Sequence, residues 1–279
     1  MLDRRIRVKG LKKLGGSSYL LILKAAEQAR LVLPGQFVML KCAPGLNDPP
    51  LLRRPFSVFD TDPSPRTNKP RGLVLLIKDV GVGSHALAAL TPGQEVFTLG
   101  PQGRPFDVSL ELGSRVAVAC LVAGGVGIAA LYLLARRFLE IGVKPVLFYG
   151  GRSAADLVLR EYFERLGMDT WYTTEDGTLG EAGVVTRPLE TFLRGRVRSG
   201  VRLYACGPWE MMKATHAVAQ KLQVPCEVSL EARMGCSLGA CMGCVVRTLD
   251  DAGDEQYLRV CLEGPVMDSR KIDWGTPPV

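Results

Sequence analysis

The sequence predicts a multidomain protein that combines an all-β domain with an α/β domain, and three observations carry this prediction. Residues 1–108 contain short apolar runs between glycine and proline turns, residues 109–225 alternate apolar strands with helices, and residues 226–279 hold four crowded cysteines. A chain of 279 residues has room for two domains and a small third one. We therefore expect an N-terminal antiparallel β-barrel, a central parallel sheet and a small cysteine-rich C-terminal domain.

The N-terminal segment reads as a series of short strands. The candidate strands are 19–23, 36–40, 57–59, 73–78 and 95–99. Turn signals such as Pro34-Gly35 and Pro92-Gly93 separate them, a pattern typical of barrels and sandwiches. One helix is expected near 84–90, and the insert 60–71 is expected to be a surface loop.

The pattern changes to strand–helix alternation in the central segment. The candidate strands are 116–122, 145–149, 169–173 and 202–205, and the candidate helices are 128–140, 156–166 and 210–221. Such alternation predicts a parallel sheet.

One part of this segment also has the length of a membrane span. Residues 116–135 form an uncharged run of twenty residues. Gly124, Gly125 and Gly127 interrupt its middle, and its first half is rich in valine. A buried strand, a glycine turn and a helix explain the run better, so no membrane span is expected.

The charge distribution and the cysteine count indicate which partners and which cellular compartment to expect. Lys and Arg total 35 against 28 Asp and Glu, a net charge of +7, and the basic residues cluster only in pairs such as Arg53-Arg54 and Arg136-Arg137. No nucleic-acid partner is therefore expected. The N-terminus has no apolar stretch after its basic residues, so the eight cysteines are expected in a cytoplasmic protein without a disulfide framework.

The four C-terminal cysteines have a distinctive spacing. Cys236, Cys241 and Cys244 follow the pattern C-x4-C-x2-C, and Cys261 follows farther along the chain. This spacing matches plant-type [2Fe–2S] proteins, and the intervening small residues allow a tight loop around a cluster. Zinc is the alternative, but zinc sites more often show two C-x2-C pairs. Four inert buried cysteines are the other alternative.

A glycine turn predicts a dinucleotide site. Gly125-Val126-Gly127-Ile128-Ala129-Ala130 follows an apolar strand and precedes a helix, as in G-x-G-x-x-A turns that receive a pyrophosphate. The usual acidic residue at the end of the next strand is missing, since that strand ends Tyr149-Gly150-Gly151-Arg152. Arg152 is either an adenosine contact or a solvated loop residue, and Glu175-Asp176 is a later candidate for the ribose.

Two further motifs in the β-rich segment suit a phosphate. Arg54-Pro55-Phe56-Ser57 offers a guanidinium and a hydroxyl. Residues 76–84 bring further backbone and hydroxyl donors before the expected helix. Each motif alone also fits an ordinary strand and turn.

In series, these motifs resemble the ferredoxin–NADP reductase superfamily over nearly the whole chain. The C-terminal stretch SLEARMGCSLGACMGC narrows the resemblance to electron-transfer subunits of NAD-dependent dihydroorotate dehydrogenases. The resemblance implies that 1–108 form an FAD-binding barrel, 109–225 an NAD-binding domain and 226–279 a [2Fe–2S] domain.

The resemblance also implies the site residues. It places FAD against Arg54, Pro55, Phe56, Ser57, Leu76, Ile77, Lys78, Gly83 and Ser84. It places NAD against Gly124, Gly125, Gly127, Asp176, Cys206 and Gly207, with Cys206 as the one catalytic candidate, beside the nicotinamide. It makes Cys236, Cys241, Cys244 and Cys261 the iron ligands.

The implied function is a redox relay in pyrimidine biosynthesis. Electrons pass from an FMN-bearing dihydroorotate dehydrogenase subunit through the [2Fe–2S] cluster and FAD to NAD+, in a heterotetramer with two of each subunit. One alternative is a related NAD(P)H–ferredoxin, sulfide dehydrogenase or hydrogenase diaphorase subunit. A transhydrogenase is less favoured, because those relatives tend to replace one of the four cysteines. The non-enzyme alternative is a zinc-bound interaction module.

Overall fold

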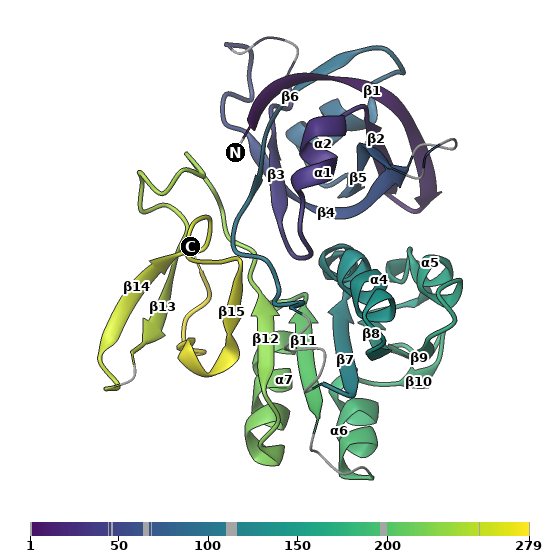
Figure 1. Cartoon of the computed structure of the whole chain (residues 1–279), viewed down its shortest axis with the longest axis vertical. Helices are drawn as coiled ribbons and strands as arrows, with labels where there is room; N and C mark the ends of the chain where they lie inside the picture. The colour runs from purple at the N-terminus through teal and green to yellow at the C-terminus, as the bar shows by residue number, and fades with distance from the viewer. Residues whose placement is uncertain are drawn as a thin grey trace.

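The computed structural model describes residues 2–43, 45, 47–63, 67, 69–109, 116–195, 200–250 and 252–278. Figure 1 shows a β-barrel at one end of the molecule and a twisted sheet with helices at the other. The C-terminal segment lies along the side of both. The predicted class, a β-barrel followed by an α/β domain and a small C-terminal domain, is confirmed.

The barrel closes in the strand order β1-β2-β5-β4-β3-β6, and its neighbouring strands pair antiparallel. Its strands are β1 (Leu2–Gly15), β2 (Ser18–Leu23), β3 (Phe37–Leu40), β4 (Arg54–Pro63), β5 (Pro70–Lys78) and β6 (Glu95–Gln102). Buried side chains alternate along β6, as expected for a strand with one face inside a barrel. The helix expected after Gly81 is α2 (Val82–Ala88).

Three parts of the barrel differ from the sequence-based expectation. The longest strand, β1, is not among the candidate strands, because it is rich in Lys and Arg and buries only Val8 fully. Its pairing with β2 and β6 makes it a strand. A short helix, α1 (Ala26–Leu31), was also not expected. The expectation of a surface loop over 60–71 is wrong where it is described, because β4 continues to Pro63 and β5 begins at Pro70.

The central sheet has seven strands in the order β10-β9-β8-β7-β11-β12-β15. They are β7 (Val118–Gly124), β8 (Lys144–Gly151), β9 (Asp169–Thr174), β10 (Glu181–Ala182), β11 (Val201–Cys206), β12 (Cys226–Ser229) and β15 (Val266–Asp268). All neighbours pair in parallel except β12 and β15. The predicted parallel sheet is thus confirmed.

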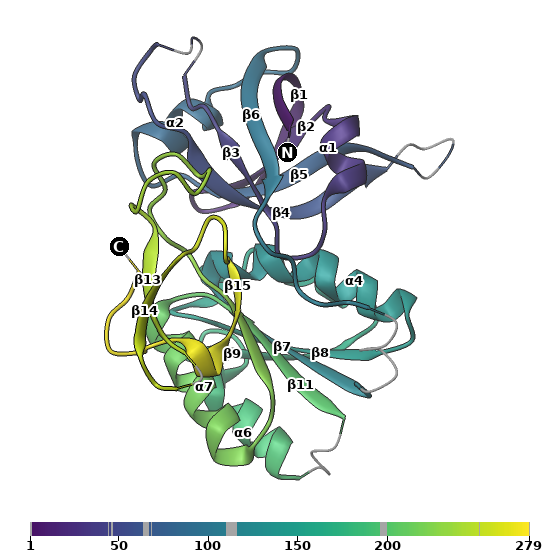
Figure 2. The ribbon, with the colours of Figure 1, turned by 60° about the vertical axis from the view of Figure 1, so that its left-hand side comes forward.

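Helices cover both faces of this sheet (Figure 2). They are the 3-10 helix η1 (Gly125–Leu131), α4 (Tyr132–Glu140), the 3-10 helix η2 (Ala154–Asp156), α5 (Arg160–Glu164), α6 (Thr186–Arg194) and α7 (Trp209–Leu222). The core beneath α4 includes Leu121 and Leu147, whereas the core beneath α6 and α7 includes Val122 and Val146. Adjacent residues of one strand therefore belong to opposite cores, so both faces of the sheet are apolar.

The helix expectations are only partly met. The helix expected over 128–140 begins as η1 and becomes α-helical at Tyr132. The helix expected over 156–166 is reduced to α5, and α6 was not expected. The uncharged run 116–135 forms β7, η1 and the start of α4. No helix in the described ranges is both long and apolar enough to span a bilayer.

The C-terminal segment begins and ends on the central sheet. Between β12 and β15 it forms the hairpin β13 (Val245–Leu249) and β14 (Glu255–Arg259), and η3 (Ser269–Lys271) follows β15. The segment also contacts the end of the barrel, because the amide of Arg104 donates to the carbonyl of Gly264 at 2.6 Å. The division of the chain at residue 226 stays a prediction, and β12 after it continues the central sheet.

Candidate functional site

The two motifs predicted to bind FAD meet at one end of the barrel. Arg54 opens β4 and pairs with Leu40, and Gly83 lies in the first turn of α2. A Cβ atom on Gly83 would lie 3.6 Å from Arg54 Cγ and 3.3 Å from Cys42 Sγ. Two motifs that are separate in sequence are therefore in contact. A side chain at position 83 would therefore pack directly against Cys42 and Arg54.

Ser84 shapes the turn that precedes α2. Its Oγ accepts hydrogen bonds from the amides of Val80 and Gly81 at 2.9 and 3.1 Å. The hydroxyl of Tyr19 donates to the Ser84 carbonyl at 2.8 Å, which ties the turn to β2. Burial raises the pKa of Tyr19, so this donor stays protonated. The turn is held by protein groups, and direct contact of Ser84 with FAD stays a prediction.

The remaining residues of the predicted FAD set belong to the barrel strands. Leu76 and Ile77 are buried, so their main chains are the parts that a ligand could contact. Pro55, Phe56 and Ser57 follow Arg54 on β4 and pair with β3. Their contacts with FAD likewise stay predictions.

The predicted NAD glycines lie where β7 and β11 end side by side. A Cβ atom on Gly127 would lie 2.4 Å from the carbonyl oxygen of Cys206, and one on Gly207 would lie 2.8 Å from the amide of Gly124. Gly207 has φ +157. These two turns can approach only because both carry glycine. The carboxyl ends of adjacent parallel strands are where open α/β sheets bind their ligands.

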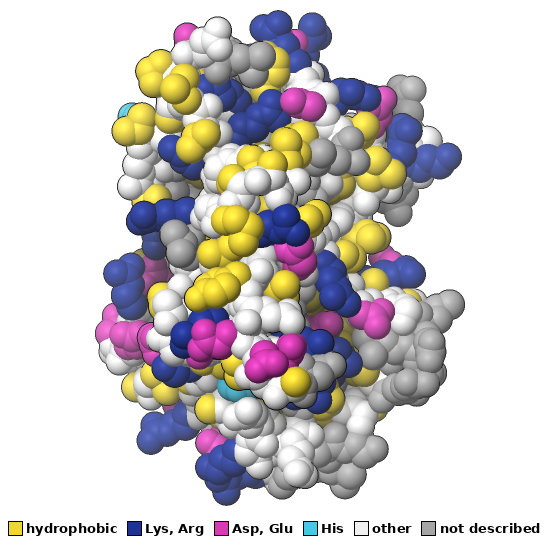
Figure 3. All heavy atoms as spheres, turned by 90° about the vertical axis from the view of Figure 1, so that its left-hand side faces the viewer, with side chains coloured by type: hydrophobic (Ala, Val, Ile, Leu, Met, Phe, Trp, Pro, Cys, Tyr) yellow, Lys and Arg dark blue, Asp and Glu magenta, His cyan; other side chains and the backbone are white. Residues whose placement is uncertain are grey.

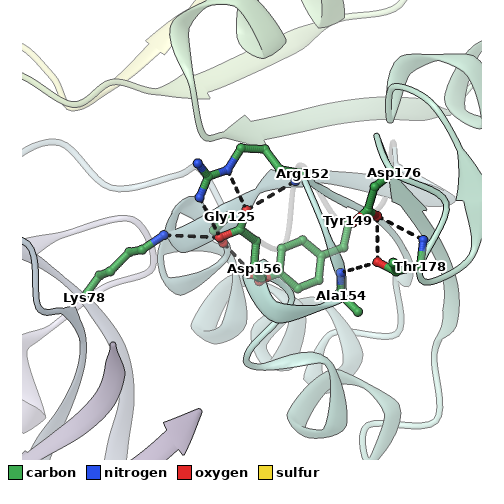
Figure 4. Close-up of polar contacts among 8 residues, drawn as sticks. All are labelled: Lys78, Gly125, Tyr149, Arg152, Ala154, Asp156, Asp176 and Thr178. Atoms are coloured by element: carbon green, nitrogen blue, oxygen red, sulfur yellow. Dashed lines mark hydrogen bonds and ion pairs between the residues drawn. The ribbon is translucent and has the colours of Figure 1, made fainter. Parts of the chain in front are cut away.

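A buried tyrosine supports the first of these turns. The hydroxyl of Tyr149, at the end of β8, lies 3.0 Å from the carbonyls of both Gly125 and Asp156 (Figure 4). Burial raises its pKa, so the hydroxyl keeps the proton that it donates. Tyr149 therefore fixes the glycine turn against the loop that follows β8.

Asp156 supplies a carboxylate near the strand end where the sequence showed no acidic residue. Its Oδ2 accepts from the Arg152 side chain at 2.9 Å and from the Arg152 amide at 3.3 Å. Its Oδ1 lies 3.2 Å from Lys78 Nζ, which projects from the barrel strand β5 (Figure 4). The hydrogen bond from Arg152, followed by that from Lys78, lowers the pKa of Asp156 to about 2. Arg152 is therefore held by an ion pair with Asp156, and no sequence pattern predicts that Asp156 folds back onto Arg152.

The loop that holds Asp176 packs against the same strand end. The amides of Glu175 and Asp176 donate to the carbonyls of Gly151 and Arg152 at 3.0 and 3.1 Å. Asp176 Oδ1 accepts from the amide and hydroxyl of Thr178, and this lowers the pKa of Asp176 (Figure 4). The carboxylate anchors its own turn, and a ribose contact stays a prediction.

Cys206, the one catalytic candidate, is only 1% exposed. Burial raises the pKa of its thiol, which is therefore protonated at neutral pH. A protonated buried thiol is a poor nucleophile. Its carbonyl lies close to Gly127, so Cys206 is placed beside the glycine turn. Its position beside the nicotinamide stays a prediction.

The C-terminal thiols form two adjacent pairs. Cys236 Sγ accepts hydrogen bonds from the amides of Cys241 and Leu238 at 3.3 Å each, and these bonds lower the pKa of Cys236 to about 6. Cys261 is buried beside Cys244, and burial followed by this neighbour raises its pKa to about 12. Within the described ranges, no three Cys, His, Asp or Glu side chains are placed as ligands of one ion would be.

This donor set fits a two-iron cluster. Four thiols are available, one is already favoured as a thiolate, and iron binding must displace the proton of Cys261. Cβ atoms on Gly235 and Gly243 would lie 3.5 and 3.6 Å from Cys241 Sγ. The loop backbone thus approaches the thiols closely, as a cluster site requires.

Comparison with known proteins assigns two regions of the chain to known domain families. Residues 231–273 match the family described as the iron–sulfur cluster binding domain of dihydroorotate dehydrogenase B, and residues 121–217 match an oxidoreductase NAD-binding domain. The dihydroorotate dehydrogenase B (NAD+) electron transfer subunit of Desulforamulus reducens is 36% identical, covering 92% of this chain and 93% of the relative. The same subunit of Bacillus cereus (strain B4264) is 34% identical, covering 95% and 96%.

Solved structures give the same class. An NADH-dependent reduced ferredoxin–NADP oxidoreductase aligns with TM-score 0.81 and 26% identity over 96% of this chain and 90% of that chain. Phthalate dioxygenase reductase aligns with TM-score 0.62 and 16% identity over 93% and 77%, which shows a shared fold. Barrel, nucleotide-binding sheet and four-cysteine domain together define an NAD-linked flavin and iron–sulfur oxidoreductase. The chain belongs to the family of dihydroorotate dehydrogenase B (NAD+) electron transfer subunits. The predicted resemblance is confirmed, and iron–sulfur is favoured over zinc.

Proposed function

We propose that this chain receives electrons from an FMN-bearing dihydroorotate dehydrogenase subunit and delivers them to NAD+ in pyrimidine biosynthesis. Its relatives are named as electron transfer subunits of that enzyme. When bound, FAD exchanges a hydride with NAD and single electrons with the [2Fe–2S] cluster. The proposal assigns FAD to the barrel end at Arg54 and Gly83, NAD to the turns at Gly127 and Gly207, and the cluster to the four C-terminal cysteines.

The protein's part in this relay is positioning. Arg54 offers a guanidinium for a pyrophosphate, and its Nη1 donates to the carbonyl of Leu52 at 2.8 Å. The glycines of the β7 and β11 turns carry no side chain that would keep a dinucleotide from the backbone of these turns. Lys78, on the proposed FAD-binding strand, forms an ion pair with Asp156 in the proposed NAD domain. This ion pair links the barrel to the central sheet.

The proposed partner is supported by exposed apolar side chains beside the four C-terminal cysteines. Leu238, Met242 and Leu262, each beside a predicted cluster cysteine, are 50, 57 and 52% exposed. Figure 3 shows this side of the molecule, where hydrophobic side chains gather between the barrel and the C-terminal segment with Lys and Arg among them. An apolar rim at a redox centre suits a docking protein. We assign it to the FMN-bearing subunit, in a cytoplasmic complex with two copies of each subunit.

Reconstitution tests the proposal. The holoprotein alone should oxidise NADH with an artificial acceptor but should not reduce NAD+ with dihydroorotate. Addition of the FMN-bearing subunit should produce dihydroorotate-dependent NAD+ reduction, and the complex should have the mass of two copies of each. A Leu238→Glu, Met242→Glu double variant should retain NADH oxidation and lose this coupled activity. Coupled activity from the isolated chain would refute the relay.

One structural comparison favours a second candidate, a ferredoxin-linked reductase. The aligned NADH-dependent reduced ferredoxin–NADP oxidoreductase covers nearly the whole chain. The comparison assay therefore measures NAD+ reduction with reduced ferredoxin as the electron donor, in place of dihydroorotate and the FMN-bearing subunit. NAD+ reduction with ferredoxin but not with a correctly folded FMN-bearing subunit would favour this candidate.

A further inference from the structure

Arg259, the last residue of β14, connects the two segments that supply the cluster cysteines. Its Nη1 donates to the carbonyl of Gly239 at 2.6 Å, and Gly239 lies in the loop between Cys236 and Cys241. Cys261 follows Arg259 by two positions in the chain. One guanidinium therefore ties the loop that carries three of the cysteines to the segment that carries the fourth.

Glu263 fixes the orientation of this guanidinium. Its Oε1 and Oε2 accept from Arg259 Nη2 and Nε at 2.5 and 3.2 Å, and Oε2 also accepts from the Arg259 amide at 2.7 Å. Both side chains are about two-thirds buried, with 31% and 29% exposure. A planar, bidentate pair of this kind leaves Nη1 pointing in one direction, toward Gly239.

The Gly239 peptide has little freedom to turn. Gly239 has φ +77, and a Cβ atom there would lie 2.7 Å from Leu262 Cδ2. Its carbonyl faces Arg259, and its backbone also makes a hydrogen bond with the Cys261 thiol. Gly239 thus lies between a fixed cation and a predicted iron ligand.

We propose that Arg259 is a positioning residue for the [2Fe–2S] site. It holds the cluster loop against the Cys261 segment through Gly239, and its positive charge offsets that of the Glu263 carboxylate near the thiolates. Hydrogen-bonding partners outside the ligand set orient the ligands and tune the metal centre. A nearby positive charge stabilises the reduced cluster, which carries one more negative charge than the oxidised form. The proposal rests on the cluster site and does not depend on which partner subunit docks.

Three variants of the holoprotein test this proposal. Arg259→Gln removes the positive charge and the planar set of guanidinium N–H donors. Arg259→Lys keeps the charge but cannot serve both Gly239 and Glu263 with a planar fork. Arg247→Gln is the matched control, because Arg247 lies on the paired strand β13 and bonds Glu255 of β14 and Asp273, which follows η3. For each protein we would measure iron release to a chelator, the midpoint potential of the cluster and its EPR spectrum, with FAD content as the test of folding.

Arg259→Gln should release iron about 10- to 100-fold faster, with a more negative midpoint potential and an altered EPR spectrum. Arg247→Gln should match the wild type. Arg259→Lys should recover the midpoint potential but still release iron faster. Unchanged iron release and potential in Arg259→Gln would overturn the proposal, as would equal effects of Arg247→Gln. If Arg259→Gln does not retain FAD, the test depends on Arg259→Lys. Iron release at the wild-type rate from Arg259→Lys would overturn the positioning role.

Discussion

Lys78 Nζ lies 3.2 Å from Asp156 Oδ1, so a strand of the barrel and the loop after β8 are joined by one ion pair. The same carboxylate holds Arg152. The packing of Phe59 on Tyr132, with ring centroids 4.5 Å apart, and the ion pair between Arg136 and Asp60 join the same two domains. The barrel and the central sheet therefore meet through charge pairs and aromatic packing around the proposed flavin–nicotinamide boundary.

Asp156→Asn should destabilise the protein by about 0.5–1 kcal/mol at neutral pH, because the pair with Lys78 is partly exposed. The folded pKa of Asp156 is lowered to about 2, below the unfolded value of roughly 4. The stabilisation is therefore present above pH 4 and is lost as the pH falls toward 2. Thermal unfolding of both proteins between pH 7 and 3 measures this. Glu140→Gln, which removes the surface pair with Arg137, is the control and should leave the stability unchanged. A stability difference between wild type and Asp156→Asn that does not change with pH would contradict the role of the Asp156 carboxylate.

Cys241→Ser should remove or destabilise the cluster while FAD stays bound, because thiolates are the iron ligands and the predicted flavin site is on the barrel. Iron content and the visible spectrum measure the two cofactors separately. Cys226→Ser is the control, since Cys226 is a buried thiol of β12 outside the cluster set. A full complement of iron in Cys241→Ser would refute the assignment of Cys241 as an iron ligand.

Arg54→Ala should weaken FAD binding by about 1.5–3 kcal/mol, as expected for loss of a hydrogen bond to a charged group. Flavin released on gel filtration measures the effect. The neighbouring Arg53 bonds Asp3 at 2.9 Å, so Arg53→Ala is a matched control that should retain FAD. Equal retention by both variants would leave Arg54 as a structural residue, whose Nη1 bonds the Leu52 carbonyl.

Gly127→Ala should cost about 1–3 kcal/mol of stability and raise the KM for NADH, because its Cβ would lie 2.4 Å from the Cys206 carbonyl oxygen. The backbone cannot relax there without separating the β7 and β11 turns. Urea unfolding and NADH oxidation with an artificial acceptor measure the two effects. Gly10→Ala is the control, since a Cβ atom at Gly10 meets nothing within 4 Å. Similar behaviour of the two variants would mean that the turns are not held in close contact.

Features that depend on local spacing could be predicted from the amino-acid sequence. Cys236, Cys241 and Cys244 are close in the chain, so one loop brings them together whatever the rest of the fold does. Alternating apolar strands and helices likewise predicted the parallel sheet, because each element must bury its own apolar face. The glycines at 124 and 127 marked the turn after β7, since glycine at a strand-to-helix junction is a local requirement.

Features that depend on distant partners became visible only in the folded structure. The charged strand β1 exists because β2 and β6 flank it, and no local pattern predicts it. Asp156 is held at the end of β8 because Arg152 and Lys78 converge on it from two domains. Cys206 is buried by the packing of the β7 and β11 turns, and Arg259 reaches Gly239 across the cluster loop. Burial and electrostatic pairing between residues far apart in the chain arise only when the chain folds, and a one-dimensional pattern does not contain them.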